Sequence, residues 1–291
     1  MEKVLSVEDV SSLQDNEIIC ANGKFSMAKS QITFHGFNNI LYIEDGAKLV
    51  NARLNFKGNN SCVFIRKTRT DRVNMIMDIY HNSLLFMDKG CSINGNIQII
   101  VSEQCHFIVG KDCMFSSGGI VRNTDAHLLY EIETNKRMNQ SRDILIGDHV
   151  WIGQNVTIMK APYIGSGSIL GIGAVAKSRV PNNSILSGNP GKVMKKNEVY
   201  WDRTVTQGFE QDQIDRYEEF DGENAKKHIF IGEDNTLVWK KKLDQISEVL
   251  QKDSTSGKLS VISELSNLPS LVVEKKIGNV LVFLNEKTSS P

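Results

Sequence analysis

The sequence predicts a mainly β protein whose chain winds into a parallel β-solenoid, and a run of six-residue blocks carries this prediction. From Ile146 the blocks read IGDHVW, IGQNVT, IMKAPY, IGSGSI, LGIGAV and AKSRVP. Each block opens on an aliphatic residue or Ala, and Gly comes second in four of the six. A period of six fits neither an α-helix nor a continuously alternating strand. It fits a coil with three flat sides, in which each block supplies a short strand and a corner.

A weaker form of the same pattern extends toward the N-terminus. Apolar residues open further blocks at Ile43, Met87, Ile93, Val109 and Phe115. We therefore expect the solenoid over about residues 36–200, held together by parallel strand pairing between coils. Residues 1–35 are expected to be an N-terminal lead-in. The sequence leaves the register open between about residues 55 and 84.

The six-residue pattern stops in the middle of the chain. Val121 and Ile146 both keep the register of their neighbours, but they are 25 residues apart, which is not a multiple of six. The segment between them cannot all be coil, and we expect a loop over about residues 126–143. Long loops inside compact domains are usually functional or disordered. This one begins beside His127, and its polar side chains provide chemistry that the rest of the solenoid lacks.

Composition excludes several classes of function. The 34 basic and 34 acidic residues cancel, so there is no overall positive charge to attract nucleic acid. The polar N-terminus and the lack of a long apolar run predict no membrane span and a cytoplasmic protein. The five cysteines contain no C-x-x-C pair, which argues against a disulfide framework and against a zinc site. We expect small buried cysteines and no bound metal.

The composition changes after about residue 203. Residues 209–220 predict a polar helix, residues 243–251 have apolar side chains at helical spacing, and residues 270–286 predict a hairpin. We interpret 203–291 as a small mixed α/β appendage without catalytic residues. Its role stays open between capping the solenoid, holding an oligomer together and gripping a long acceptor.

Three stretches together resemble a known family: Asn123-Thr-Asp-Ala-His127, IGDHVWIGQNVTI from Ile146, and SGNPGKVMKK from Ser187. The chain is similar to hexapeptide-repeat acyltransferases with a left-handed parallel β-helix. Within them it looks most like the bacterial O-acetyltransferases that modify capsular and lipopolysaccharide sugars, including sialic-acid polymers. The resemblance covers about residues 85–197. It implies acetyl-CoA as donor, a hydroxyl of a sugar or polysaccharide as acceptor, and a homotrimer with active sites between subunits.

The resemblance also implies catalytic roles. His127 matches the general base, and an ordinary histidine pKa near 6.5 suits proton transfer at neutral pH. The group that orients its ring is left open between Asp125, Glu131 and a backbone carbonyl. Asn123 matches a position that contacts the acceptor or the base, although a corner residue would explain it equally well. Trp151 is expected to wall the site or to donate its indole N–H.

The cofactor contacts are implied in the same way. Backbone groups at Gly153, Gln154, Ile172 and Ala174 match the positions that bind the pantetheine arm. Three lysines near the end of the solenoid match the partners of the phosphates: Lys177, Lys192 and Lys195. The chain departs from the family pattern at Ala176–Arg179, where the basic side chain is displaced. His149 is expected to be an exposed structural residue.

Other classes of function fit the sequence less well. A metal-dependent β-helix that hydrates carbon dioxide needs a second histidine five residues from His127, but Arg122 and Ile132 occupy those positions. A non-catalytic sugar-binding scaffold is disfavoured, because the loop histidine and the groove glycines are present. Transfer of acetyl to the nitrogen of an amino or nucleotide sugar, or to a small alcohol, stays the alternative within the enzyme class.

Overall fold

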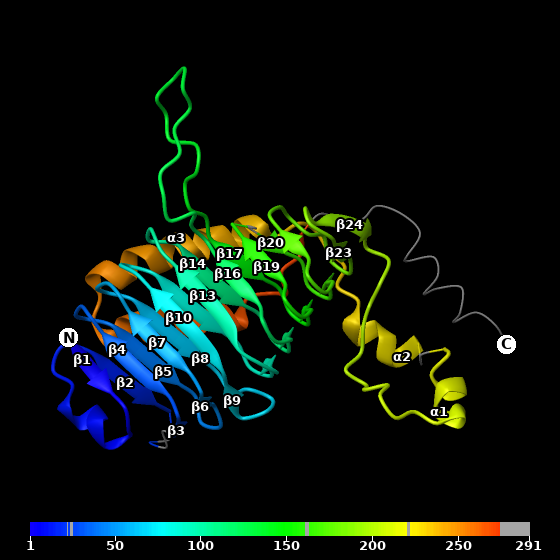
Figure 1. Ribbon diagram of the computed structural model, residues 1–291, viewed down its shortest axis with the longest axis horizontal. Helices are drawn as coiled ribbons and strands as arrows, with labels where there is room; N and C mark the ends of the chain where they lie inside the picture. The colour runs from blue at the N-terminus through cyan, green and yellow to red at the C-terminus, as the bar shows by residue number, and fades with distance from the viewer. Residues whose placement is uncertain (22, 24–25, 161–162, 220–221, 274–291) are drawn as a thin grey trace.

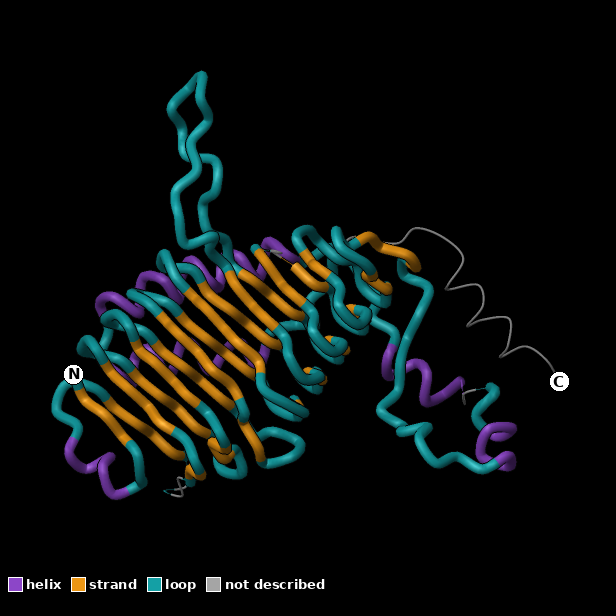
Figure 2. Tube along the Cα trace, in the orientation of Figure 1, coloured by secondary structure: helices purple, strands orange, loops and turns teal. Residues whose placement is uncertain are grey.

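The computed structural model describes residues 1–21, 23, 26–160, 163–219 and 222–273. Over most of this length the chain winds as a three-sided prism with stacked coils, and Figures 1 and 2 show the strands running across it in parallel rows. The parallel β-helix predicted from the six-residue blocks is confirmed. The hairpin predicted at 270–286 lies mostly outside the described residues.

Each side of the prism is a sheet. The first sheet has the order β1-β4-β7-β10-β13-β16-β19-β22, and the second has the order β2-β5-β8-β11-β14-β17-β20. The third side consists of β3-β6-β9 followed by β12-β15-β18-β21-β23-β24. Pairing is parallel throughout, except that β1 and β24 pair antiparallel at the two ends.

The strands of the first sheet are β1 (Glu2–Val4), β4 (Gln31–Phe34), β7 (Arg53–Phe56), β10 (Met75–Ile79), β13 (Ile97–Val101), β16 (Ile120–Arg122), β19 (Thr157–Met159) and β22 (Val175–Ala176). Those of the second are β2 (Glu17–Cys20), β5 (Ile40–Ile43), β8 (Cys62–Ile65), β11 (Leu84–Met87), β14 (His106–Val109), β17 (Ile144–Ile146) and β20 (Tyr163–Ile164). The third side contains β3 (Met27–Ala28), β6 (Lys48–Val50), β9 (Arg72–Val73), β12 (Ser92–Ile93), β15 (Met114–Phe115), β18 (Trp151–Ile152), β21 (Ile169–Leu170), β23 (Ile185–Ser187) and β24 (Lys192–Lys195).

The parallel coils begin earlier than the sequence indicated. Strand β2 already pairs in parallel with β5, from Glu17 with Ile40 to Cys20 with Ile43. Residues before 36 are therefore part of the solenoid rather than a separate lead-in. The short apolar segments there were not recognised because they do not follow the six-residue spacing.

Coil length explains why the register was hard to follow upstream. Equivalent side chains on adjacent N-terminal coils are 22 residues apart, as in the hydrogen bond from Asn38 to Asn60, whereas the later coils repeat at 18. The corner between the second and third sides keeps the six-residue step in these coils, from Met87 at the end of β11 to Ile93 in β12. The extra residues lie mainly on the first side, where β10 and β13 are five residues long. A single hexapeptide period therefore describes only the C-terminal coils.

The interior of the prism is an apolar column. Every second side chain along a strand points inward. Because the coils stack in register, similar side chains of adjacent coils lie on one another, as do the Phe34 and Phe56 rings with 4.6 Å between their centroids. Cys91 and Cys113 are buried in this column, as expected for small apolar side chains. Burying each large aliphatic or phenylalanine side chain of this column contributes about 1.5–3 kcal/mol to the stability of the fold.

A polar insertion interrupts the coils between β16 and β17. Figure 1 shows this loop, drawn in green, standing away from the prism at the corner between the first and second sheets. A single antiparallel bridge joins Tyr130 to Arg137 within it. The predicted loop at about 126–143 is therefore present, with β16 ending at Arg122 and β17 beginning at Ile144.

The described helices lie outside the coils. They are η1 (Glu8–Ser12), α1 (Gln211–Arg216), α2 (Gly222–Ala225), η2 (Lys226–His228), α3 (Thr236–Lys252), α4 (Thr255–Ser263) and η3 (Glu264–Asn267). None of these helices is long and apolar enough to span a bilayer. The two predicted C-terminal helices correspond to α1 and α3.

Helix α3 runs back along the solenoid and covers the second sheet (Figure 1). Its buried face presents Trp239, Leu243, Ile246 and Leu250 to outward-facing apolar side chains of that sheet. Those side chains are Ile40, Cys62, Phe64, Leu84, Phe86, Ile108 and Leu145. The part of the appendage from α3 onward thus packs along the second side of the prism, whereas α1 and α2 lie beyond the end of the coils (Figure 1). The sequence did not indicate this role.

Candidate active site

The root of the protruding loop is fixed to the preceding coil by Asn123. Its side chain is buried, its Oδ1 accepts from the Ser102 N–H at 2.9 Å, and its Nδ2 donates to the Ser102 carbonyl at 2.9 Å. Both ends of the amide are thus used within the chain. This geometry favours the corner role for Asn123 over contact with a substrate.

Asp125 is held on the loop side of the same corner. Its carboxylate forms an ion pair with Lys160 and accepts a hydrogen bond from Asn139 Nδ2 at 3.0 Å. The hydrogen bond from Lys160, more than any other interaction, lowers the pKa of Asp125. The carboxylate therefore stabilises the loop root in its ionised form, and within one chain it does not bond the ring of His127.

His127 is exposed at the beginning of the loop. Its backbone carbonyl accepts from Asn139 Nδ2 at 2.7 Å, so the amide of Asn139 bridges Asp125 and the His127 backbone. Among the residues that the structure describes, none forms a hydrogen bond with the His127 ring. Glu131, the other predicted orienting group, accepts instead from the hydroxyl of Thr134 at 2.5 Å. The ring is free to meet groups supplied from outside the chain.

Trp151 lies on a different side of the prism. It is in β18 of the third sheet, 37% exposed, with its ring centroid 5.7 Å from that of Trp201. The loop that carries His127 leaves the corner between the first and second sheets. One chain therefore does not bring the predicted base and the predicted wall of the site together.

His149 is buried, contrary to the exposed position expected from the sequence. Its ring stacks between Trp201 and His228, with centroids 4.1 and 4.4 Å away. Nδ1 lies 2.8 Å from Asp112 Oδ2 and Nε2 lies 3.0 Å from the Trp201 carbonyl. The segment that follows the solenoid covers this corner, which sequence spacing could not indicate. The structural role expected for His149 agrees with these contacts.

The same contacts perturb Asp112. Burial alone would raise its pKa, but hydrogen bonds from His149 and Arg69 and the charge of Arg203 lower it to about 2. Arg203 contributes through its Nε, 3.0 Å from Asp112 Oδ1. Asp112 thus joins the third side of the solenoid to the segment that covers it.

The residues proposed for the pantetheine arm lie at the corner between the third and first sheets. Gly153 has no room for a side chain, because a Cβ there would lie 2.7 Å from the Leu170 carbonyl oxygen. Ile172 is 72% exposed and Gln154 is also exposed. Ala174 is buried, its N–H donates to Gly171 and its carbonyl accepts from Thr157. The corner therefore offers an exposed apolar surface at Ile172, whereas the polar groups of Ala174 are already used.

The predicted lysines separate into two places. Lys177 lines a pocket of about 270 Å³ at the loop root, together with Asp125, Met138, Gln140, Arg142, Met159 and Lys160. Lys192 and Lys195 are exposed on β24 at the C-terminal end of the solenoid, where Lys195 lies 3.8 Å from Glu198. Since Asp125 is already paired with Lys160, the pocket is cationic overall and suits an anionic group.

The chain is similar to known acetyltransferases in sequence and in structure. No family model matches the chain. It is 36% identical to a polysialic acid O-acetyltransferase of Neisseria meningitidis over 131 residues, 45% of this chain and 60% of the relative. It is 34% identical to a polysialic acid O-acetyltransferase of Escherichia coli O1:K1 over 105 residues, 36% of this chain and 34% of the relative. The matched segments thus span between a third and two thirds of these relatives.

Two solved structures share the architecture. The polysialic-acid-specific acetyltransferase NeuO superposes with a TM-score of 0.60 and 29% identity, over 70% of this chain and 93% of that one. The polysialic acid O-acetyltransferase OatWY gives a TM-score of 0.52 and 26% identity, over 71% of this chain and 100% of that one. The chain is thus similar, in fold and in sequence, to these two polysialic acid acetyltransferases.

The structure reveals three further residues that the sequence did not single out, two at the loop root and one on the third side of the prism. Asn139 joins the two halves of the loop, Lys160 pairs with Asp125, and Trp201 lies against Trp151. Asn139 and Lys160 lie 14 and 35 residues from Asp125, and no local pattern connects them. Trp201 had a weak signal, because it follows the last predicted coil as part of an aromatic pair with Tyr200.

Proposed function

We propose that this chain is an acetyl-CoA-dependent O-acetyltransferase whose acceptor is a hydroxyl of an acidic cell-surface polysaccharide of the sialic-acid type. The observation that carries the proposal is the exposed His127 at the root of a loop that interrupts a β-helix like those of the polysialic acid acetyltransferases. The similarity to polysialic acid O-acetyltransferases supports the acceptor class.

The chemistry requires one proton transfer and no covalent enzyme intermediate. The acceptor hydroxyl oxygen attacks the thioester carbonyl carbon while its proton passes to a ring nitrogen of His127. The carbon–sulfur bond then breaks, and the departing thiolate takes up a proton, which restores the neutral ring. The free position of the His127 ring is consistent with this role, since no described residue occupies either nitrogen.

The pantetheine arm of the donor fits, in part, the corner between the third and first sheets. Exposed Ile172 and the open backbone at Gly173 provide an apolar surface for a pantetheine arm, and Gly153 allows the coils to stack closely beside it. Cations for the phosphates are available at Lys192 and Lys195 on β24. Lys177 lies instead at the loop root, where an anionic group of the acceptor is a more suitable partner.

The site is proposed to form between copies of the chain, in a homotrimer. His127 and Trp151 lie on different sides of one prism, so a second copy is needed to bring them together. The loop also presents exposed apolar side chains: Leu128, Leu129, Tyr130, Ile132 and Met138. Apolar side chains that protrude from a polar loop suit burial against a neighbouring subunit.

The test is transfer of acetyl groups to a defined panel of acceptors. The purified chain is incubated with acetyl-CoA and oligosialic acid, polysialic acid, an amino sugar or a small alcohol. Thiol release and product mass are measured. We expect an alkali-labile acetyl ester on the sialic-acid acceptors and little reaction with the others. An acetyl amide on the amino sugar, with no ester elsewhere, would instead establish N-acetylation.

A further inference from the structure

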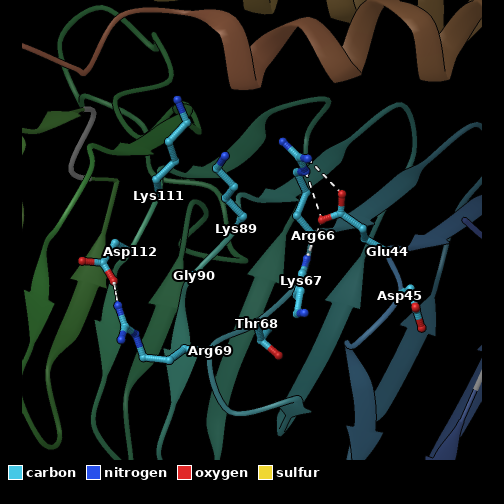
Figure 3. A pocket seen from close by; sticks show the side chains of 10 residues that line it. All are labelled: Glu44, Asp45, Arg66, Lys67, Thr68, Arg69, Lys89, Gly90, Lys111 and Asp112. Atoms are coloured by element: carbon cyan, nitrogen blue, oxygen red, sulfur yellow. Dashed lines mark hydrogen bonds and ion pairs between the residues drawn. The ribbon is translucent and has the colours of Figure 1, made fainter.

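Apart from the pocket at the loop root, a groove lies at the corner between the second and third sheets. It has a volume of about 750 Å³ and spans the N-terminal coils (Figure 3). Its lining residues are Glu44, Asp45, Arg66, Lys67, Thr68, Arg69, Lys89, Gly90, Lys111 and Asp112. The lining contains five cations and three carboxylates, so the surface carries excess positive charge in a chain whose total charge is zero.

The two arginines are already neutralised. Arg66 donates to Glu44 at 2.9 Å and to the Ser266 hydroxyl at 2.9 Å, and Arg69 lies 2.9 Å from Asp112. No ion pair joins the ammonium groups of the lining lysines to any residue that the structure describes. The excess charge is therefore carried by Lys67, Lys89 and Lys111.

The backbone positions of these three lysines form a regular row. The strands before them pair in parallel, Ile65 with Met87 and Met87 with Val109, and each lysine follows its strand by two residues. Adjacent parallel strands are about 4.8 Å apart, so the row offers one cation per coil along the solenoid axis. Figure 3 shows Lys89 and Lys111 extending to the same side of the groove, whereas the Lys67 side chain extends the other way, beside Gly46. Lys67 therefore reaches the same ligand only after its flexible side chain changes rotamer. Like charges at this spacing repel one another unless an anionic ligand lies across them.

The lining also contains an unpartnered polar group. The Thr68 side chain is 2% exposed, and its hydroxyl has no hydrogen-bond partner among the described residues. A buried polar group without a partner is costly, so such groups in folded proteins usually meet a ligand or an ordered water. Thr68 comes directly after Lys67 in the row, which places a potential hydrogen-bonding group beside the cations.

We infer that the row of Lys67, Lys89 and Lys111 binds an extended anionic polysaccharide, with one acidic group of the polymer opposite each coil. A compact anion would meet only one or two of these cations, whereas a polymer with a regular charge spacing meets them all. The lining contains no aromatic side chain on which bases could stack, which disfavours single-stranded nucleic acid. The choice of a polysaccharide rests on the proposed function.

The groove connects to the predicted site through specific contacts. Its last member, Asp112, takes a hydrogen bond from Arg203, and the neighbouring Trp201 lies against Trp151. A polymer held along the coils would thus extend toward the side of the prism that carries Trp151. The groove acts in affinity and positioning, whereas His127 acts on the reacting hydroxyl.

The test compares two sets of charge removals. In one variant Lys67, Lys89 and Lys111 are all replaced by Gln. In the control, three exposed lysines of α3 are replaced by Gln: Lys240, Lys241 and Lys252. Binding of polysialic acid, polygalacturonate and neutral dextran is measured by titration without acetyl-CoA, at two salt concentrations. Acetyl transfer to a short sialic-acid oligomer and to the long polymer is measured separately.

We expect the groove variant to lose about tenfold or more in affinity for both acidic polymers and in kcat/KM for the long acceptor, because charged contacts contribute to affinity and to encounter rate. The control variant, the short acceptor and dextran should show no such change. Equal binding by the two variants, or no binding of acidic polymers by the unaltered chain, would overturn the inference. If the unaltered chain binds these polymers through the lysines but transfers no acetyl group, the groove is supported and the proposed function fails.

Discussion

The carboxylate of Asp125 is paired with the ammonium group of Lys160, on the coil that follows the protruding loop. This ion pair fixes the loop root to the solenoid, and the His127 ring, two residues further on, has no hydrogen-bond partner within the described part of the chain. The orienting group of the proposed base is therefore expected to come from a neighbouring subunit or from the acceptor.

Replacing His127 by Ala is expected to lower kcat at least about a hundredfold, because a general base acts on the transition state. The fold and the affinity for CoA should be unchanged, since the ring makes no hydrogen bond with the described residues. His35→Ala is the control, because His35 is also exposed and follows a strand of the first sheet. Retention of more than a tenth of the kcat at saturating substrates would remove His127 from the mechanism.

Asp125→Asn tests whether this residue positions the loop or orients the base. We expect kcat to fall less than about tenfold and stability by about 0.2–1 kcal/mol, as is typical of an exposed ion pair. Since the pKa of Asp125 is lowered in the folded chain, the stabilisation from the ion pair is fully present above the ordinary pKa near 3.9 and is lost as the pH falls through the lower folded pKa. A double-mutant cycle with Lys160→Met measures the coupling. A hundredfold loss of kcat, with a shifted pH–rate profile, would instead make Asp125 the partner of His127.

Asp112→Asn is expected to lower the free energy of unfolding by about 1–2 kcal/mol at neutral pH. The folded pKa of about 2 lies below the value near 3.9 of an unfolded aspartate, so the stabilisation is fully present above pH 4 and disappears as the pH falls toward 2. Urea titrations of both proteins across this range measure the difference. A difference that does not change with pH would show that the carboxylate charge is not responsible.

Ile246→Ala tests the docking of α3 on the second sheet. Ile246 is fully buried there, and its truncation should cost about 2–5 kcal/mol of stability while leaving kcat/KM nearly unchanged. Val238→Ala on the same helix is the control, because Val238 is 46% exposed and its truncation should change the stability by no more than about 0.5 kcal/mol.

A chain that ends at residue 203 should aggregate, because the apolar outer face of the second sheet is then uncovered.

Mixed assemblies test the site between subunits. Light scattering should give a trimer for the unaltered chain, and His127→Ala and Trp151→Ala should each be impaired alone. When the two variants are co-expressed, random assembly leaves about a quarter of the intersubunit sites with both residues intact. The co-expressed variants should therefore recover about a quarter of the kcat per site of the unaltered trimer. An active monomer, or no recovery in proven mixed trimers, would contradict the assembly.

The sequence by itself determined the coil and the place where it is interrupted. The six-residue blocks after Ile146 encode their own geometry, because a side chain that points inward on each flat side must be aliphatic and a tight corner must be small. The failure of that spacing between Val121 and Ile146 located the loop, and His127 within it, with no tertiary information. These signals are local, so a linear pattern suffices to show them.

Only the tertiary structure decided which side chains meet across coils and what covers the outside of the prism. Wider N-terminal coils, at 22 residues, bring Lys67, Lys89 and Lys111 into one row, a relationship hidden by the six-residue spacing. The pairing of Asp125 with Lys160, the burial of His149 under Trp201 and the docking of Ile246 join residues distant in sequence. Their positions depend on coil length and on the path of the chain after the solenoid, and both are set by packing of the whole rather than by any local segment.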